Sequence, residues 1–382
     1  MPGFELINYQ EKQAVNKLFK EGAVFFAHGF QKLRKKYHVR EFEVKAAKKI
    51  GSKYSLAVTS GTSATLIALK ALGVKPGDEV ITQAFNFIAT VEAIIESGAK
   101  PIIVNVDQTY NMCPTELKKS ITKKTKAIIP VHMLGVSADM DEIMKIAKKN
   151  NLPILEDNCE AMGAKYKRKN LCTIGKVGVV SFDYGKTITT GEGGMIFTDN
   201  KNVYKYCMQY HDHGHELNPK YPRGMDTKSI TGFNYRMTEL QAVIGKVQLE
   251  KLSFIMKENK KRYNSIFKHL KNLKVNFRKI PNKTEPIFDT LIFNIQNNKI
   301  RKEIVKLLNS NGFGTKNLPD AIKWHCAYYW DHAINLKQIK KLKKTKILLA
   351  NSIAIPIWLR KSNSDYDILG KKISKILTNV KK

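Results

Sequence analysis

The stretch SLAVTSGTSATLIALKALGVKPGDEVI, residues 55–81, contains the pattern that decides the fold class. Residues 55–58 form a short apolar run, and the SGTS segment at 60–63 leads from it into a helical pattern that stops at Gly73. Glycine is a common helix-stop residue, and the Lys-Pro-Gly-Asp sequence at 75–78 is typical of a turn. A second apolar run follows the turn. The stretch therefore predicts a strand, a helix and a second strand.

The same alternation continues along the first half of the chain. Repeated βα units whose strands are continuously apolar predict a largely parallel sheet with helices on both faces, that is, an α/β fold. The predicted strands are residues 55–58, 80–82, 102–106, 127–131 and 153–155, and the predicted helices are residues 64–73, 87–97, 139–150 and one that opens at Pro114.

The chain length and a change of composition near residue 236 predict two domains. At 382 residues the chain exceeds the size at which single cores usually stop growing. Residues 237–270 form a long Lys-rich helical pattern, and short strand-like runs at 286–295 and further helical patterns follow it. We therefore expect a large domain over residues 1–250 and a smaller α+β domain over residues 251–382, joined by a helix.

Composition excludes several classes of protein. Hydrophobic residues make up 43% of the chain, too many for a chain that is disordered throughout. No apolar run reaches the roughly 18–20 residues that cross a bilayer, and no secretory signal is visible at the start of the sequence. The five cysteines are odd in number and contain no C-x-x-C pair, which argues against a disulfide framework and a zinc site. We therefore expect a cytoplasmic enzyme with no metal and no membrane contact.

The net charge of +33 raises the question of nucleic-acid binding. Of the 66 basic residues only nine are arginine, the residue that base and phosphate contacts favour. The lysines are spread along the chain, and no nucleic-acid recognition motif is present. We therefore expect no nucleic-acid partner and interpret the charge as a solvated surface that attracts small anions.

The segment VVSFDYGKTITTGEGGM, residues 179–195, places Lys186 among small residues. A lysine that attacks a carbonyl has to be held on a short turn and partly desolvated, so that its amine is available. Small neighbours let a planar cofactor approach the backbone. The alternative is that Lys186 is an ordinary lysine on a loop, and the choice depends on what lies beside it.

Three further positions follow predicted strands, at the edge of the sheet where α/β folds bind ligands. The 60–63 segment begins a helix, and free backbone N–H groups there bind phosphate, although an ordinary helix cap has the same sequence. Asp157 follows a buried strand, where it could hold a pyridinium nitrogen protonated or cap a helix. Phe87 could stack on a cofactor ring or belong to the core.

Together these residues resemble the DegT/StrS sugar aminotransferases, a family with the aspartate-aminotransferase fold (fold type I). The resemblance runs from about residue 42 to residue 356. It implies that the cofactor is pyridoxal 5'-phosphate and that Lys186 binds it covalently. It also implies that Asp157 pairs with the pyridine nitrogen, so that both residues are catalytic.

The same resemblance assigns the remaining cofactor contacts. Phe87 stacks on the ring, and Glu160 lies near the ring hydroxyl, where most members of the family carry Gln or His. Relatives that replace the lysine by His dehydrate deoxysugars, so the lysine here favours transamination. The phosphate contacts that the resemblance implies are Thr62, Ser63, Ser181 and, from the other subunit of a homodimer, Asn234 in the segment 232–241.

Three segments narrow the resemblance within the family. Residues 181–194, 211–216 and 314–325 are similar to those of the 8-amino-3,8-dideoxy-manno-octulosonate aminotransferases of lipopolysaccharide assembly. This resemblance implies transfer of an amino group from glutamate to the C8 aldehyde of an eight-carbon acid sugar. The alternatives are an aminotransferase for a nucleotide-linked keto sugar and a pyridoxal-phosphate-binding homologue without turnover.

Basic side chains in or near two of these segments are the candidates for holding the sugar carboxylate. The His-x-His-x-His order at 211–215 also fits a metal site or a plain surface loop, although no second ligand group lies near it in the sequence. We expect substrate contacts and no bound metal. The candidate substrate-binding residues are His213, His215, Arg223, Lys316 and His325.

Overall fold

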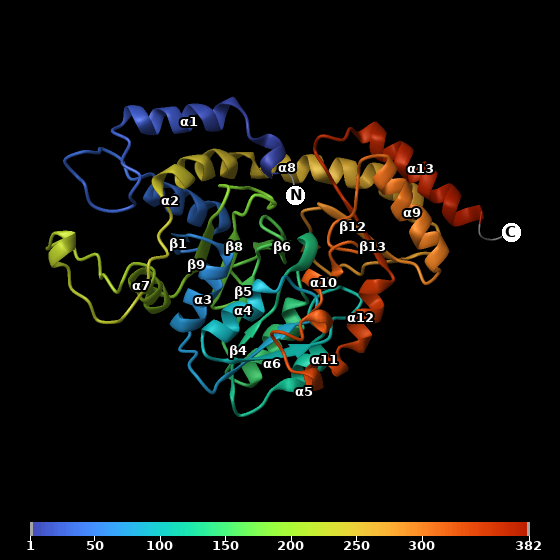
Figure 1. Ribbon diagram of the computed structural model, residues 1–382, viewed down its shortest axis with the longest axis horizontal. Helices are drawn as coiled ribbons and strands as arrows, with labels where there is room; N and C mark the ends of the chain where they lie inside the picture. Colours follow the sequence, from blue (N-terminus) through green and yellow to red (C-terminus); the bar gives the residue numbers. More distant parts are fainter. Residues whose placement is uncertain (1–2, 380–382) are drawn as a thin grey trace.

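The computed structural model describes residues 3–379 and is shown in Figure 1. Its centre is a sheet with the strand order β3-β2-β4-β5-β8-β9-β1. Two hydrogen-bonded ladders make up this sheet, and the parallel bridges Ile128–Ile154 and Val131–Asp157 join them between β4 and β5. In chain order the strands are β1 (Tyr54–Val58), β2 (Glu79–Gln83), β3 (Lys100–Val104), β4 (Thr125–Ile129), β5 (Leu155–Asp157), β8 (Val177–Ser181) and β9 (Gly194–Thr198).

The sheet is mostly parallel, as the sequence predicted, with β9 as the exception. β9 runs antiparallel to both of its neighbours, β8 and β1. A parallel return requires a crossover, usually a helix, whereas an antiparallel return does not. Residues 182–193, between β8 and β9, are rich in Gly and Thr and form no helix, so the chain turns back directly. This turn carries Lys186.

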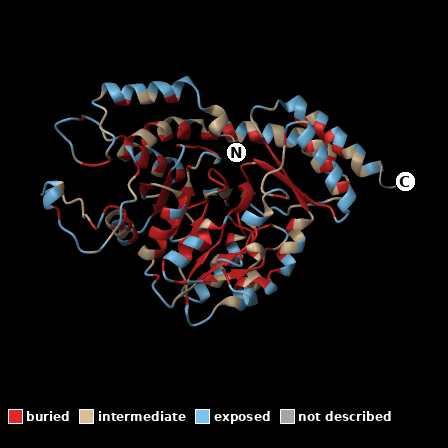
Figure 2. Ribbon diagram, viewed as in Figure 1, coloured by how far each residue is buried: buried red, intermediate tan, exposed pale blue. Residues whose placement is uncertain are grey.

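Helices cover both faces of the sheet. In β1, Leu56 and Val58 pack in one core with α3, whereas Ala57 packs in another with α2 and α8. Successive residues of a strand point to opposite faces, so a continuously apolar strand requires this double cover. Figure 2 shows the buried strands between helices whose outer faces are exposed. The helices around the large sheet are α2 (His38–Ile50), α3 (Gly61–Ala71), α4 (Ala89–Glu96), α5 (Pro114–Ser120), α6 (Met140–Lys149), α7 (Lys201–Tyr210) and α8 (Glu239–Leu270).

The helix α8 connects the large sheet to a second, smaller sheet, and Figure 1 shows it running past both. Thr238 caps its start in a capping box with Gln241. The smaller sheet has the order β10-β12-β13 and an apolar core of its own. The domain boundary expected at residue 250 falls within α8 and stays a prediction. The elements of this region are β10 (Asn276–Phe277), β12 (Thr290–Asn294), α9 (Asn298–Ser310), β13 (Ser352–Pro356) and α13 (Asn363–Asn379).

Part of the C-terminal sequence packs against the large sheet instead. Trp330 is buried in one cluster with Ile88 and Val91, and a backbone bridge joins Phe85 to Cys326. This segment therefore lies beside the loop that follows β2. Its helices are α10 (Ile322–His325), η4 (Ala327–Tyr329), α11 (Leu336–Lys341) and α12 (Lys343–Ala350).

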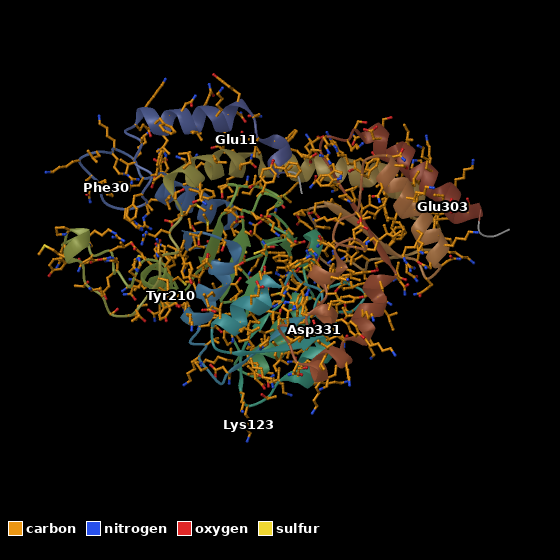
Figure 3. The ribbon with its side chains drawn as sticks, in the orientation of Figure 1. Glu11, Phe30, Lys123, Tyr210, Glu303 and Asp331 are labelled. Carbon is orange, nitrogen blue, oxygen red and sulfur yellow. The ribbon has the colours of Figure 1, made fainter. Side chains whose placement is uncertain are left out.

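Residues 21–37 and 211–236 extend from one side of the molecule, on the left in Figure 1. Figure 3 labels Phe30 in the first of these segments and Tyr210 at the end of α7, where the second begins. Phe30 is 53% exposed in the single chain. The remaining elements are η1 (Gly3–Leu6), α1 (Tyr9–Lys20), η2 (Met133–Gly135), β6 (Lys165–Tyr166), β7 (Lys169–Asn170), η3 (Arg223–Met225) and β11 (Thr284–Glu285).

The longest helix, α8, has 32 residues and carries charged side chains along its length. Across residues 3–379, no helix combines the length and the apolar character that crossing a membrane requires.

Candidate active site

A cavity of about 520 Å³ lies at the carboxyl ends of the central strands. It collects residues that follow β1, β2, β5 and β8, which is the edge of the sheet where the sequence placed the ligand site. The sequence-predicted residues that line the cavity are Thr62, Phe87, Asp157, Glu160, Ser181, Lys186, Lys316 and His325.

One end of the cavity is built from the start of α3 and the end of β8. Thr62 and Ser181 line the cavity there, beside the N-terminus of α3, whose first N–H groups have no partner within the helix. A Cβ on Gly61 would lie 2.7 Å from Cβ of Ser181, so this close approach requires glycine. Backbone donors, hydroxyl groups and a helix N-terminus together make an anion site.

Ser63 has a different surrounding from Thr62. Its Oγ accepts a hydrogen bond from the backbone N–H of Ser60 at 3.0 Å, and the Ser60 Oγ accepts one from the Ser63 N–H. Ser63 is buried and is not among the residues that line the cavity. In this chain it completes the capping box of α3.

Asp157 is the last residue of β5, and its carboxylate is buried at the cavity wall. One oxygen, Oδ2, accepts a hydrogen bond from Oγ1 of Thr90 at 2.6 Å. The other, Oδ1, accepts one from the backbone N–H of Cys159 at 3.1 Å. These two donors hold the carboxylate in a single orientation.

Lys186 is held by its own turn and is paired inside the cavity. Its backbone N–H donates to the carbonyl of Asp183 at 3.0 Å, which closes the turn. Its Nζ lies 3.2 Å from Oε1 of Glu160. Oε2 of Glu160 is buried and accepts no hydrogen bond from the described residues.

Burial and charge oppose each other at this pair. Burial by itself raises the pKa of Glu160, but the positive charges around it, chiefly Lys186, outweigh burial and bring that pKa to about 2. Burial by itself lowers the pKa of Lys186, but the Glu160 carboxylate outweighs burial and raises it above its usual value. In the chain without cofactor, the Glu160 carboxylate thus favours the protonated form of Lys186 and acts against desolvation.

Phe87 is 42% exposed, which argues against the core position that the sequence left open. Its ring lies 5.5 Å from that of His325, with an angle of 45° between the two planes. Both rings line the cavity. An aromatic face is thus available to a flat ligand.

Lys316 and His325 of the 314–325 segment reach the cavity, but neither is a free cation. Nζ of Lys316 donates to Oδ2 of the buried Asp289 at 2.7 Å. Nδ1 of His325 lies 2.9 Å from the carbonyl oxygen of Ala321, so Nδ1 carries the hydrogen and Nε2 is the acceptor of the neutral ring. Burial lowers the pKa of His325, which favours this neutral form.

The remaining predicted residues lie away from the cavity of their own chain. Arg223 pairs with Asp212, and Nδ1 of His215 lies 3.5 Å from Oδ2 of Asp226. His213 and Asn234 are exposed on the 211–236 segment. Their predicted roles toward substrate or a second subunit stay predictions. In residues 3–379, no group of three His, Cys, Asp or Glu side chains is placed to hold a metal ion.

Several cavity residues were missed by sequence reasoning. The Thr90 hydroxyl donates to Oδ1 of Asn86, four residues earlier, and to Oδ2 of Asp157. A prediction that residues 86–90 form a helical turn would have placed Thr90 beside Asn86 and so near the site. Nothing local marks the residues from the two ends of the chain. The lining residues that were not singled out as site residues are Phe4, Thr65, Asn86, Ala89, Thr90, Val131, Cys159, Asp183, Gly185, Glu192, Asn317 and Trp358, whereas Ser60 and Gly61 belong to the predicted 60–63 phosphate segment.

A sheet of this order, with a lysine on the turn after β8 and a carboxylate at the end of β5, is the architecture of fold type I aminotransferases. The chain belongs to the DegT/DnrJ/EryC1/StrS aminotransferase family, whose sequence profile matches residues 21–374. The predicted fold class is confirmed, and an aminotransferase that uses pyridoxal phosphate is confirmed at the level of the family.

Individual relatives support the family in sequence and in structure. GDP-perosamine synthase of Escherichia coli O157:H7 is 42% identical over 214 residues, and the chain matches 57% of that synthase's length and 56% of its own. The aminotransferase from Psychrobacter cryohalolentis superposes with a TM-score of 0.87 at 27% identity, covering 98% of both chains. GDP-4-keto-6-deoxymannose-3-dehydratase, solved with a trapped PLP-glutamate geminal diamine, superposes with a TM-score of 0.82 at 27% identity, covering 97% of this chain and 98% of the dehydratase.

Proposed function

We propose that this chain is a sugar aminotransferase that moves an amino group from an amino acid to a sugar carbonyl, with pyridoxal phosphate as its cofactor. The observation that carries the proposal is the meeting of Lys186, Asp157 and the N-terminus of α3 in one cavity. A purely cofactor-binding homologue does not need all three.

The residues present fit pyridoxal phosphate. The close approach of Gly61 to Ser181 and the free N–H groups at the start of α3 suit a phosphate group. Phe87 presents an aromatic face on which a pyridine ring can stack. The buried Oε2 of Glu160 has no hydrogen-bond partner among the described residues, which suits a polar group of a ligand. When bound, the cofactor supplies an electron sink for the charge that develops as a proton leaves the donor's α-carbon.

The side chains of this chain then have distinct tasks. Nζ of Lys186, when it is not bonded to the cofactor, would take the proton from the donor's α-carbon and deliver it to the bound cofactor, so that the donor leaves as its oxo acid. The Asp157 carboxylate, oriented by Thr90, keeps a positive charge on the ring nitrogen. Glu160 holds the ammonium of Lys186 in place before the cofactor enters.

For the acceptor we propose the C8 aldehyde of 3,8-dideoxy-8-oxo-manno-octulosonate, with glutamate as the donor. Two of the three segments that resemble the octulosonate enzymes, 181–194 and 314–325, contribute residues to the same cavity, which supports this choice. The neutral His325 ring offers Nε2 as an acceptor for a sugar hydroxyl.

A nucleotide-linked keto sugar is the second candidate. Two of the relatives named above, GDP-perosamine synthase and GDP-4-keto-6-deoxymannose-3-dehydratase, carry a GDP-linked sugar in their names, and Lys316 is already paired with Asp289. A paired lysine is a weaker partner for the carboxylate of an acid sugar than a free one.

The purified enzyme decides between these acceptors. Glutamate alone should change the absorbance of the bound cofactor, since the first half of the reaction needs no sugar. Adding the octulosonate aldehyde should then restore the original absorbance and yield the 8-amino product. Restoration by a GDP- or UDP-linked keto sugar alone favours the second candidate, and no response to glutamate contradicts the aminotransferase proposal.

We also propose a homodimer in which Asn234 of one subunit reaches the phosphate of the other. A cytoplasmic location and the lack of nucleic-acid, membrane and metal partners stay predictions from composition.

A further inference from the structure

The segment Gly3–Leu6 lies directly on the turn that carries Lys186. The backbone N–H of Gly3 donates to the carbonyl of Lys186 at 3.2 Å. A Cβ on Gly3 would lie 2.7 Å from that carbonyl oxygen, so only glycine fits this approach. Gly3 is buried there, and Phe4, the next residue, reaches the cavity.

The Phe4 ring joins two other aromatic rings at the cavity. It stacks on Tyr184, with 5.1 Å between centroids and 19° between planes, and meets Trp358 edge-on at 6.1 Å. The Trp358 indole Nε1 donates to the carbonyl of Phe313 at 2.8 Å, which fixes the orientation of that ring. Phe4 and Trp358 both line the cavity.

Glu5 connects the Gly3–Leu6 segment to residues 359–360, which follow β13. Its carboxylate accepts hydrogen bonds from the backbone N–H groups of Leu359 at 2.9 Å and Arg360 at 3.2 Å. Phe4 is thus held on both sides, by Gly3 on the lysine turn and by Glu5 on the C-terminal segment. A ring held in this way presents a preformed surface to a ligand.

The cavity has two walls of different origin. The residues of this chain's own cavity that are proposed to hold the cofactor all lie between residues 60 and 192. The other set comes from the two ends of the chain and consists of Phe4, Lys316, Asn317, His325 and Trp358. If the first wall holds the cofactor, the second is left for the reacting substrates.

We infer that Phe4 is a specificity-determining residue that packs, with Trp358, against an apolar C–H face of the acceptor sugar. This inference rests on the proposed function. A sugar ring or chain has apolar C–H faces between its hydroxyl groups, and an aromatic ring is the side chain that packs on such a face. An amino acid donor such as glutamate has a short polar skeleton and does not need this surface.

The experiment compares Phe4→Ala, Phe4→Tyr and the wild type as complete enzymes, with Phe254→Ala as a matched control. Phe254 is 54% exposed on α8 and is not among the cavity residues. Phe4→Ala should raise the acceptor KM about three- to tenfold and leave the glutamate half-reaction unchanged. Phe4→Tyr keeps an aromatic ring and should have an acceptor KM close to that of the wild type. Phe254→Ala should change neither the acceptor KM nor the glutamate half-reaction.

Calorimetric binding of the amino-sugar product supplies a second readout that needs no turnover. Its Kd should weaken by the same factor in Phe4→Ala. An unchanged KM and Kd would overturn the inference, and so would an equal loss in the glutamate half-reaction, because Phe4 would then act through Lys186. If the wild type does not respond to glutamate at all, the proposed function fails, and product binding alone still decides the role of Phe4.

Discussion

Nζ of Lys186 lies 3.2 Å from Oε1 of Glu160, and each group shifts the pKa of the other toward its charged form. The carboxylate keeps the lysine protonated, and the lysine keeps the carboxyl ionised. The bond that Lys186 is proposed to form with its cofactor needs a neutral amine. The pair therefore makes cofactor loading depend on pH.

Replacing Glu160 by Gln should move cofactor loading to lower pH. Glu160 raises the pKa of Lys186, so its loss lowers that pKa and makes the neutral amine available earlier as the pH rises. The rate of reconstitution of the apoenzyme with pyridoxal phosphate, measured against pH, tests this. Glu250→Gln, which breaks an exposed pair with Lys45 (2.9 Å), is the control. An unchanged pH profile in Glu160→Gln would contradict the prediction.

The same pair predicts how the apoprotein responds to acid. The pKa of Glu160 falls from an ordinary 4.5 to about 2 in the folded chain, so its ionised form stabilises the fold above pH 4.5. That contribution is lost as the pH falls from 4.5 toward 2. Denaturation midpoints at pH 3 and pH 7 should therefore differ more in the wild type than in Glu160→Gln, and equal differences would count against an ionised Glu160.

Lys186 should be the residue that carries the cofactor. Borohydride reduction of the holoenzyme followed by peptide mapping should find the pyridoxyl group on Lys186 and not on Lys316, the other cavity lysine. Lys186→Arg should reduce activity by about 10²–10⁴-fold or more, because a positioned proton carrier is lost. A pyridoxyl group on Lys316 would refute the assignment.

Thr90 should act as a positioning residue for Asp157. Thr90→Val removes the 2.6 Å bond to the carboxylate, and a bond to a charged group is worth about 1.5–3 kcal/mol, or roughly ten- to over a hundredfold in rate. The absorbance of the bound cofactor should also change its pH dependence, which a purely structural role would leave alone. Thr90→Ser keeps the hydroxyl and should restore both readouts.

Lys316 should be needed for stability. Its partner Asp289 is 1% exposed, so Lys316→Met leaves a buried carboxylate unpaired, at a cost of about 3–5 kcal/mol. Chemical denaturation should show this loss, and Asp289→Asn in the Lys316→Met background should recover part of it. A Lys316→Met enzyme of wild-type stability would show that the ion pair is absent in solution.

Asn234 should complete the site of a second subunit. Mixed dimers of Asn234→Ala and Lys186→Ala chains should regain activity, because one of their two sites then has both residues intact. Each variant alone should stay weakly active or inactive. Verified mixed dimers without regained activity would show that the site is not shared.

The local sequence determined most of the secondary structure and marked the candidate cofactor residues. Apolar runs became β1 to β5 and helical patterns became α3 to α6, because strand and helix periods depend on neighbouring residues. Asp157 and Phe87 could be named because each follows a predicted strand, and parallel strands bring their carboxyl ends to one edge of a sheet, whereas Lys186 could be named because it stands among small residues.

Tertiary structure alone decided which side chains pair and which distant segments meet. Arg223 and His215 have the chemistry of substrate ligands but pair with Asp212 and Asp226 of their own segment. Phe4 reaches the turn of Lys186 from the far end of the sequence, and no local pattern marks that contact. The physical reason is that the periodicity of a helix or strand sets the face of that element on which a side chain lies. Which residue that side chain contacts depends on how whole layers of the fold pack against one another.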